Sequence, residues 1–265
     1  MSAKILSFMN EKGGIGKTSF TFNISWELAK RDYRVLLIDL NGQEANLSYF
    51  CGLDDLNSQF PARNDIDTIC EVLRGKRTIS DVTIQIKENL YLVPANNDVE
   101  HINQSAGTKT FREALNKARE AYDFIFIDVG PSTNWNQYMT LACADYIVIP
   151  MQPNVASLQS NIGASQSIVE AQSEINPGLR VLGILFNEYT TRTNVSRFAM
   201  QQAELQAEKL GTTVFEHGIR RSVAMSENPQ LHEGITDYAP NSDAAQDARL
   251  VTDELIERIQ EAEQR

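Results

Sequence analysis

The chain has 265 residues, of which 42% are hydrophobic and 22% are charged, so it can bury a full core and has the composition of a soluble globular protein. No apolar segment is long enough to span a bilayer, and the N-terminus enters an apolar strand without a signal-peptide pattern, which predicts a cytoplasmic protein. The net charge of −11 argues against DNA binding over the whole surface, because phosphate neutralisation supplies most non-specific affinity.

A phosphate-binding loop is the first predicted element. It occupies residues 12–18, between the apolar run 5–9 and a helical pattern over 18–30, and reads Lys-Gly-Gly-Ile-Gly-Lys-Thr. Its three glycines are Gly13, Gly14 and Gly16. Without Cβ atoms, the backbone can turn several N–H groups toward one anion, and the helix N-terminus adds partial positive charge.

The polar side chains of this loop suit ATP and Mg²⁺. Lys17 is expected to reach the terminal phosphates, and Thr18 to offer its hydroxyl to Mg²⁺. The predicted ATP-binding residues of the loop are Lys12, Gly13, Gly14, Ile15, Gly16, Lys17, Thr18 and Ser19. A Gly-rich surface turn is the alternative, but strand, glycine turn, Lys-Thr and helix follow in the order that nucleotide binding needs.

The loop departs from the general P-loop pattern at Glu11, where a further glycine is usual. With the second lysine at Lys12, the motif Lys-Gly-Gly-x-Gly-Lys-Thr resembles that of the ParA/MinD family of ATPases, a deviant Walker A motif. The resemblance implies that Lys12 crosses a dimer interface and contacts phosphates bound to the partner subunit. ATP binding and homodimer formation would then be one event.

A second functional segment follows the apolar run 34–39, which is typical of a buried parallel strand. Asp39 ends this run, at the ligand side of such a sheet. ParA-like proteins carry an Asp-x-Asp pair here whose second aspartate orients the attacking water, whereas this chain has Asn41 at the second position. Asparagine brings no negative charge and accepts no proton, so we expect a slow ATPase. Alternatively, Gln43 or Asp39 takes over the water and turnover is normal. The predicted catalytic residues are Lys12, Lys17, Asp39 and Asn41.

Strands and helices alternate along the whole chain. Besides the elements above, we expect helices near 46–51 and over 67–73, 109–121, 155–174 and 242–263, strands over 90–93, 122–128, 145–149 and 179–186, and an exposed connection over 53–64. This alternation predicts an α/β fold, a doubly wound, mostly parallel sheet with helices on both faces, as in P-loop NTPases. We expect residues 1–265 to form a single ParA-like domain.

The strand 122–128 ends in a Walker B pattern. Asp128 is expected to hold Mg²⁺ through a water beside the P-loop, although an aspartate here could instead cap the next turn. Gly130 stands where the family usually has proline, so it retains an N–H that could donate to the γ-phosphate.

Asn187 follows the strand 179–186. In MinD-like relatives an asparagine at this place reads the adenine edge, since its amide both donates and accepts; a turn asparagine is the alternative. Further along, the segments 219–223, 226–229 and 238–242 resemble three landmarks of ParA/Soj proteins. By this resemblance Ile219 and Arg220 join the ATP site, although Arg220 replaces the usual proline.

Four arginines are the candidates for a local DNA-binding patch: Arg192, Arg197, Arg220 and Arg221. Their alternative is a role as solvated surface residues. The final helix has an acidic outer face, which anionic lipid repels, so no membrane anchor is expected.

The resemblance as a whole implies a Mg·ATP-dependent dimer switch that positions or segregates plasmid, chromosome or other cargo on nucleoid DNA, with a ParB-like activator. One rival is an ATP-binding dimeric interaction module with little or no hydrolysis. Another is a metabolic P-loop enzyme that phosphorylates or amidates a small molecule. Nitrogenase-type reductases need bridging cysteines, whereas Cys51, Cys70 and Cys143 lie at other places and form no metal-type spacing.

Overall fold

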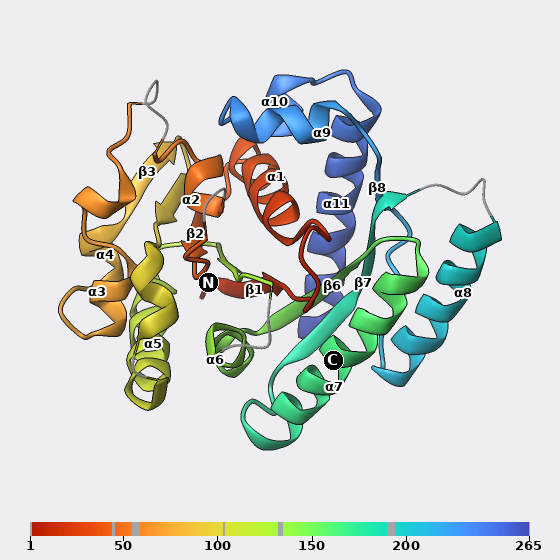
Figure 1. Cartoon of the computed structure of the whole chain (residues 1–265), viewed down its shortest axis with the longest axis horizontal. Helices are drawn as coiled ribbons and strands as arrows, with labels where there is room; N and C mark the ends of the chain where they lie inside the picture. The colour runs from red at the N-terminus through yellow and green to blue at the C-terminus, as the bar shows by residue number, and fades with distance from the viewer. Residues whose placement is uncertain are drawn as a thin grey trace.

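The computed structural model describes residues 2–43, 46–54, 59–102, 104–131, 135–189 and 194–264. Within these ranges the centre is an eight-stranded sheet in the order β3-β4-β2-β5-β1-β6-β7-β8 (Figure 1). The strands are β1 (Lys4–Phe8), β2 (Val35–Asp39), β3 (Ile84–Lys87), β4 (Leu90–Val93), β5 (Phe124–Asp128), β6 (Tyr146–Met151), β7 (Arg180–Tyr189) and β8 (Ile219–Arg220). Among them only β3 and β4 pair antiparallel. The predicted doubly wound, mostly parallel sheet is confirmed.

Apolar runs build the central strands. Every residue of β2 and of β5 is buried, because helices cover both faces of the sheet and leave no solvent side for polar residues. Successive side chains point to opposite faces, so each strand contributes to two cores. In β5, Ile125 and Ile127 belong to one core, and Phe124 and Phe126 to the other.

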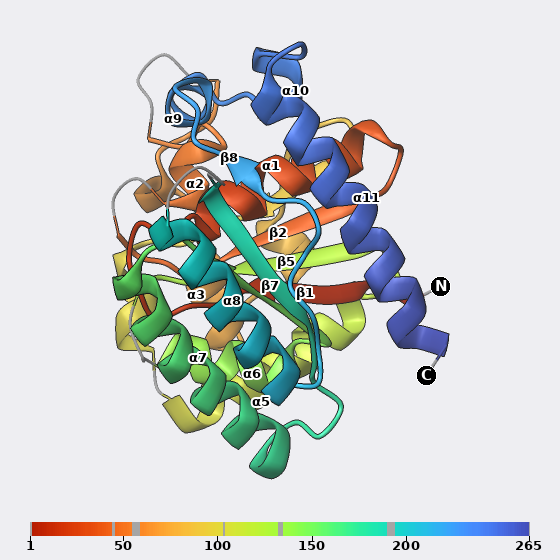
Figure 2. The same ribbon diagram turned by 90° about the vertical axis from the view of Figure 1, so that its right-hand side faces the viewer.

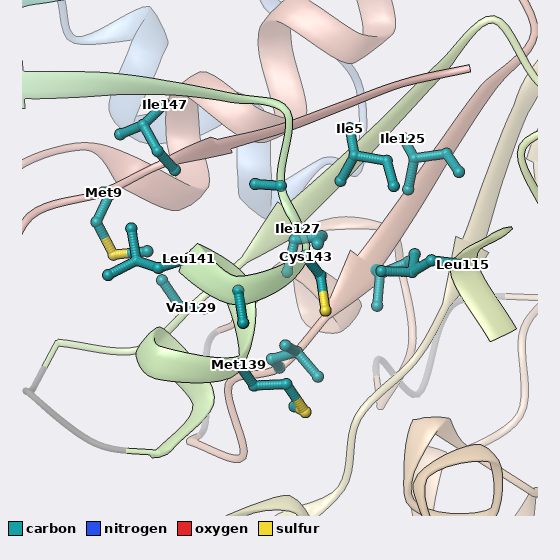
Figure 3. Packing of buried hydrophobic residues seen from close by; sticks show 14 of the residues in the cluster. Ile5, Met9, Leu115, Ile125, Ile127, Val129, Met139, Leu141, Cys143 and Ile147 are labelled. Carbon is teal, nitrogen blue, oxygen red and sulfur yellow. The ribbon is translucent and has the colours of Figure 1, made fainter. Parts of the chain in front are cut away.

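The helices divide between these two cores. The principal helices are α1 (Lys17–Lys30), α2 (Leu47–Phe50), α3 (Ile69–Leu73), α4 (Ile79–Val82), α5 (Gln104–Ala118), α6 (Trp135–Cys143), α7 (Val155–Glu174), α8 (Asn194–Lys209), α9 (Ala224–Glu227), α10 (Ile235–Tyr238) and α11 (Asp243–Gln264). Three short 3₁₀ helices lie at η1 (Arg63–Asp65), η2 (Asn97–His101) and η3 (Asn228–Gln230). Residues of α3, α5, α6, α7 and α8 join the core that contains Ile125, part of which Figure 3 shows, and residues of α1, α2, α10 and α11 join the other. Figure 2 shows α7 and α8 side by side, with α11 across the sheet from them.

The order of the strands reverses at β1. This strand pairs with β5 on one side and with β6 on the other. β2 and β4 lie beyond β5, whereas β7 and β8 lie beyond β6. In open α/β sheets, ligands bind in the crevice at the carboxyl ends of the strands at such a reversal. The Gly-rich loop leaves β1 at this crevice and leads directly into α1.

Side-chain caps determine where two of the helices begin. Thr68 and Glu71 form a capping box at the start of α3, so this helix begins at Ile69 and not at residue 67 as expected. At α7, the side chain of Asn154 accepts a hydrogen bond from the backbone N–H of Ser157, and the helix spans 155–174 as predicted.

Other expectations were wrong in part. The segment 53–64 is not simply an exposed connection, because Leu53 and Arg63 are buried. Pro150 lies inside β6, and β7 continues to residue 189, so that Asn187 is inside a strand. The antiparallel strand β3 carries no apolar run that would have revealed it, since it is only partly buried at the edge of the sheet.

The described helices include none that is both long and apolar enough to cross a membrane. Cys51, Cys70 and Cys143 are buried free thiols. In the part of the chain that the structure describes, His, Cys, Asp and Glu side chains form no group of three that could hold a metal ion. A Mg²⁺ site in a nucleotide-binding protein needs fewer protein ligands than that, because the ion keeps several waters.

Candidate nucleotide site

A cleft of about 1110 Å³ opens at the carboxyl ends of the central strands. The loop after β1, the loops after β2 and β5, the end of β7 and the segment that follows β8 all contribute to its lining. Of the residues predicted from the sequence, the lining includes Gly13, Gly14, Ile15, Gly16, Lys17, Thr18, Ser19, Asn41, Asn187, Arg220 and Arg221. The predicted phosphate loop and the predicted adenine side therefore share one cavity.

The backbone of the loop has the curvature that the glycines were expected to supply. Gly14 and Gly16 have φ angles of +68° and +105°, which residues with a Cβ rarely adopt. Gly16 is the N-cap of α1 and, within the described ranges, no side chain caps the first N–H groups of the helix. These donors and the positive end of the helix dipole make an anion site at the mouth of the cleft.

The two lysines of the loop point to different partners. The ammonium of Lys17 donates to the carbonyl oxygen of Lys12 at 3.0 Å, inside its own loop. Burial lowers the pKa of Lys17, and the nearby charge of Asp128 opposes this effect. The ammonium of Lys12 instead donates to the hydroxyl of Ser157, at the start of α7, at 3.2 Å. Lys17 is thus placed for a phosphate in this loop, and Lys12 is directed away from it.

Asp128 and Asp39 lie side by side behind the loop. They are register partners at the ends of β5 and β2. The hydroxyl of Thr18 donates to Oδ2 of Asp128 at 2.8 Å, which links the P-loop to the Walker B strand. Burial raises the pKa of Asp128 to about 7, the charge of Asp39 adds to this, and Thr18 and Lys17 oppose it.

The residues present fit a Mg²⁺ ion. Oδ1 of Asp128 is buried and has no hydrogen-bond partner among the described residues, although a buried carboxylate oxygen normally has one. A metal-bound water would satisfy this atom, and the hydroxyl of Thr18 contacts the other oxygen of the same carboxylate. Burial and the charge of Asp39 both raise the pKa of Asp128, and a dication here would offset that repulsion.

Comparisons with known proteins identify the family of the chain. A family profile described as an AAA domain matches residues 3–181. The chromosome-partitioning ATPase Soj of Thermus thermophilus is 31% identical over 259 residues, which cover 97% of this chain and 97% of Soj. The chain belongs to the ParA/MinD family of P-loop ATPases.

Solved structures of this family share the fold. The apo McdA structure from Cyanthece has a TM-score of 0.81 at 20% identity and covers 96% of this chain and 99% of McdA. Cobyrinic acid a,c-diamide synthase from Mycobacterium smegmatis, with a bound ATP analogue and magnesium, has a TM-score of 0.79 at 25% identity, covering 96% and 94%. McdA and a cobyrinic acid a,c-diamide synthase thus share this fold, so the fold does not by itself decide the function.

In this ParA/MinD ATPase, both carboxylate oxygens of Asp39 accept hydrogen bonds from the protein itself. Its Oδ1 accepts the backbone N–H of Asn41 at 2.8 Å, and its Oδ2 accepts both the N–H and the hydroxyl of Ser48, at 2.9 and 2.6 Å. Burial raises the pKa of Asp39 to about 6, and these hydrogen bonds limit the rise. The contacts hold the loop after β2 against the sheet, so Asp39 acts on the cleft by positioning that loop.

Asn41, by contrast, reaches the cleft itself. Its side chain is 7% exposed, and its Oδ1 accepts the backbone N–H of Gln43 at 3.2 Å. A Cβ on Gly130 would lie 3.0 Å from this oxygen, so Asn41 packs directly over the glycine. The structure therefore brings the predicted water-positioning residue beside the loop after β5.

Asn187 supports the P-loop. Its Nδ2 donates to the carbonyl oxygen of Ile15 at 3.0 Å, and a Cβ on Gly16 would lie 2.3 Å from that nitrogen. This bond uses the donor side of the amide. The amide has a second N–H and a carbonyl oxygen, and Asn187 also lines the cleft.

The predicted arginines differ in their surroundings. Arg220 pairs with Asp247 through Nε and Nη2, both at 2.8 Å, and with Asp243 at 3.0 Å, so α11 neutralises its charge. Arg221 and Arg197 are exposed, the latter on α8. Arg192 lies outside the described residues. Arg220 consequently has a structural role in the wall of the cleft, where it joins β8 to α11. Ile219 precedes it in β8.

Sequence reasoning missed several residues that hold the site together. Asn10 is fully buried and joins the P-loop to β6, because it donates to the carbonyl of Pro150 at 2.9 Å and accepts the N–H of Lys12 at 3.1 Å. Ser48 and Ser157 were not singled out either. An asparagine directly before a glycine-rich loop was a usable signal, whereas nothing in the sequence marks the two serines.

Proposed function

We propose that this ParA/MinD ATPase is a Mg·ATP-dependent dimer switch that partitions DNA or positions cargo on the nucleoid. The observation that carries the proposal is the divergence of the two lysines: Lys17 turns into its own phosphate loop, and Lys12 turns out of it. A lysine directed outward is suited to phosphates on a second subunit. The relationship to Soj over nearly the whole length of both chains supports the same reading.

ATP would occupy the cleft, with its phosphates in the loop 13–19. Mg²⁺ would contact the hydroxyl of Thr18 directly and Asp128 through a water, and the ion would neutralise charge that develops on the phosphates. Asn187 would accept from the adenine edge through its carbonyl oxygen. The N–H of Gly130 would donate to the γ-phosphate.

Hydrolysis is proposed to be slow. Asn41 lines the cleft beside Gly130, and its amide would hold the attacking water but could not accept a proton from it. Asp39 is hydrogen-bonded within the protein through both oxygens, which favours Asn41 over Asp39 for this task. A dimeric ATP-binding module with little or no hydrolysis is the second candidate, and the same asparagine is the observation that favours it.

DNA contact is proposed to depend on ATP, because a dimer presents each arginine twice. Arg221 and Arg197 remain candidates because both are exposed, and Arg220 is a weaker one because two carboxylates already neutralise it. Arg192 remains a candidate from sequence alone. The proposal includes a ParB-like activator, one ParA-like domain over residues 1–265, and a cytoplasmic, nucleoid-associated protein.

Sizing of the purified protein with ADP and with a non-hydrolysable ATP analogue tests the proposal. The wild type should be a monomer with ADP and a dimer with the analogue. Lys17→Ala should lose nucleotide binding, whereas Lys12→Ala should bind nucleotide as a monomer and fail to dimerise. Equal loss of nucleotide affinity in both variants, or a wild type that stays monomeric with the analogue, would contradict the dimer switch.

A further inference from the structure

Arg63 is a buried arginine beside the nucleotide cleft. It begins η1, and only 7% of its surface is exposed. Because a guanidinium stays charged in a folded protein, its burial requires partners that accept its hydrogen bonds. Its Nε pairs with the carboxylate of Asp54 at 2.5 Å, and its Nη1 donates to the carbonyl oxygen of Gln43 at 3.0 Å. Gln43 lines the cleft, so Arg63 joins η1 to the wall of the cleft.

The charge of Arg63 is balanced by Asp54. Besides the ion pair, the backbone N–H of Arg63 donates to Oδ1 of Asp54 at 2.8 Å. Asp54 has a φ of +69°, a left-handed conformation that persists in a residue with a Cβ where the surroundings hold it, as these two contacts do. The bond from Nη1 to Gln43 is therefore an additional contact, and its effect falls on the cleft. Burial raises the pKa of Asp39, and the charge of Arg63 opposes this rise, so the guanidinium also acts on the carboxylate behind the P-loop.

The turn 41–43 transmits the contact with Arg63 to Asn41. The N–H of Gln43 donates to Oδ1 of Asn41 at 3.2 Å, and Nδ2 of Asn46 donates to the carbonyl of Asn41 at 2.5 Å. These two bonds span two and five residues along the chain, whereas the bond from Arg63 to Gln43 spans 20. Gln43 thus holds the side chain of Asn41 through its N–H, and is itself held by a distant segment through its carbonyl. A functional side chain keeps its direction only when such supporting contacts fix it.

We propose that Arg63 is a positioning residue for ATP hydrolysis, which holds the amide of Asn41 in the direction that the attacking water requires. The inference rests on the proposed role of Asn41 in hydrolysis and adds a residue that acts through it. The phosphates would be held by the loop 13–19, which Arg63 does not contact in the described structure. A small displacement of a positioning group costs much in the chemical step and leaves substrate binding unchanged.

The substitution Arg63→Lys tests the inference, with Arg119→Lys as the matched control. Lysine keeps the charge beside Asp54 but lacks the planar fork that reaches two acceptors at once. Arg119 likewise pairs with a carboxylate, that of Asp145 at 2.7 Å, and donates to a backbone carbonyl, that of Ala3 at 2.7 Å. These partners directly precede β6 and β1, at the end of the sheet opposite the cleft.

Phosphate release measured over a range of Mg·ATP concentrations separates kcat from KM. We expect Arg63→Lys to lower kcat roughly ten-fold at unchanged KM, with the same oligomeric state as the wild type on sizing with a non-hydrolysable ATP analogue. Arg119→Lys should lower the melting temperature and leave kcat unchanged. An unchanged kcat in Arg63→Lys, or an equal loss of kcat in Arg119→Lys, would overturn the inference while the proposed function stands.

The loss must also act through Asn41. Asn41→Ala should itself lower kcat, and the addition of Arg63→Lys to it should lower kcat no further, a result that a merely structural role of Arg63 would not produce. If the two losses multiply, Arg63 acts elsewhere and the inference is refuted. If the wild type releases no phosphate, or if Asn41→Ala keeps the wild-type kcat, the proposed role of Asn41 in hydrolysis itself fails, and the inference fails with it.

Discussion

Replacement of Gly16 by alanine tests whether Asn187 and the P-loop are packed as closely as the structure has them. Gly16 has a φ of +105°, and an added Cβ would lie 2.3 Å from Nδ2 and 3.0 Å from Cγ of Asn187. Contacts under 3.0 Å do not persist, so either the asparagine or the loop must move. Gly14 is the matched control, because its φ is +68° but no described atom lies within 4 Å of an added Cβ.

The two substitutions differ in a calculable way. Gly14→Ala carries only the backbone cost of an L-residue at positive φ, about 1–2 kcal/mol. Gly16→Ala carries a similar cost and, in addition, the overpacking against Asn187, about 1–3 kcal/mol. Asn187→Ala alone removes the hydrogen bond to Ile15 and should cost about 0.5–1.5 kcal/mol. In the double variant Gly16→Ala, Asn187→Ala the overpacking disappears, so its cost should fall below the sum of the single costs by about 1–3 kcal/mol.

Urea unfolding of the nucleotide-free protein measures these free energies. The cycle of Gly16 with Asn187 should be non-additive, and the cycle of Gly14 with Asn187 additive. If Gly16→Ala costs no more than Gly14→Ala, or if its cycle with Asn187 is additive, then the asparagine does not support the loop and the reasoning is wrong. Preserved stability with weakened nucleotide affinity in Asn187→Ala alone would instead favour the adenine role.

Three further outcomes are expected. Gly234→Ala should destabilise the protein by about 1–3 kcal/mol in thermal melts, because the added Cβ would lie 2.2 Å from Cγ of the buried Trp26; an unchanged melting temperature would contradict this packing. Burial raises the pKa of Asp237, but hydrogen bonds from two lysines and Trp26 outweigh it and hold the value at about 2. The ionised Asp237 stabilises the folded protein by about 1 kcal/mol after solvent screening, and this contribution is present above pH ~4 and lost as the pH falls toward 2. The free energies of urea unfolding of the wild type and Asp237→Asn should therefore differ at pH 6 and converge at pH 2. Asn41→Asp should raise phosphate release several-fold with DNA and activator present, and equal or lower turnover would exclude Asn41 as the substituted water-positioning residue.

The sequence predicted the elements that rest on strong local patterns. The strand predicted over 122–128, which the structure has over 124–128, and the helix 155–174 were found because a buried strand and a long helix each have a continuous signal. The link between Thr18 and Asp128 was also foreseeable, since the P-loop and Walker B motifs fix both ends of it. The burial of Asp39 and Asp128 then follows, because both end adjacent parallel strands inside the sheet.

Side-chain partners distant in sequence were not predictable in the same way. Arg220 was a candidate for both the ATP site and DNA contact, but it pairs with Asp247, 27 residues further along the chain. Asn187 was assigned to the adenine, yet its amide reaches Ile15 across a separation of 172 residues. Such pairings depend on how α11 and β7 pack against the rest of the molecule, and no local pattern of polar residues encodes that packing.

Asn41 also affects the charge repulsion in the site, because the site already contains the two buried carboxylates of Asp39 and Asp128. Burial raises the pKa of Asp39 and of Asp128, and the negative charge of Asp39 raises that of Asp128 further. A third carboxylate at position 41, which is 7% exposed, would add to this repulsion as long as no cation is bound. Asparagine keeps the hydrogen bond to Gln43 without that charge. Asparagine at this position therefore relieves repulsion in the nucleotide-free site, so Asn41→Asp should make the protein's stability depend more strongly on Mg²⁺ and nucleotide than it does in the wild type.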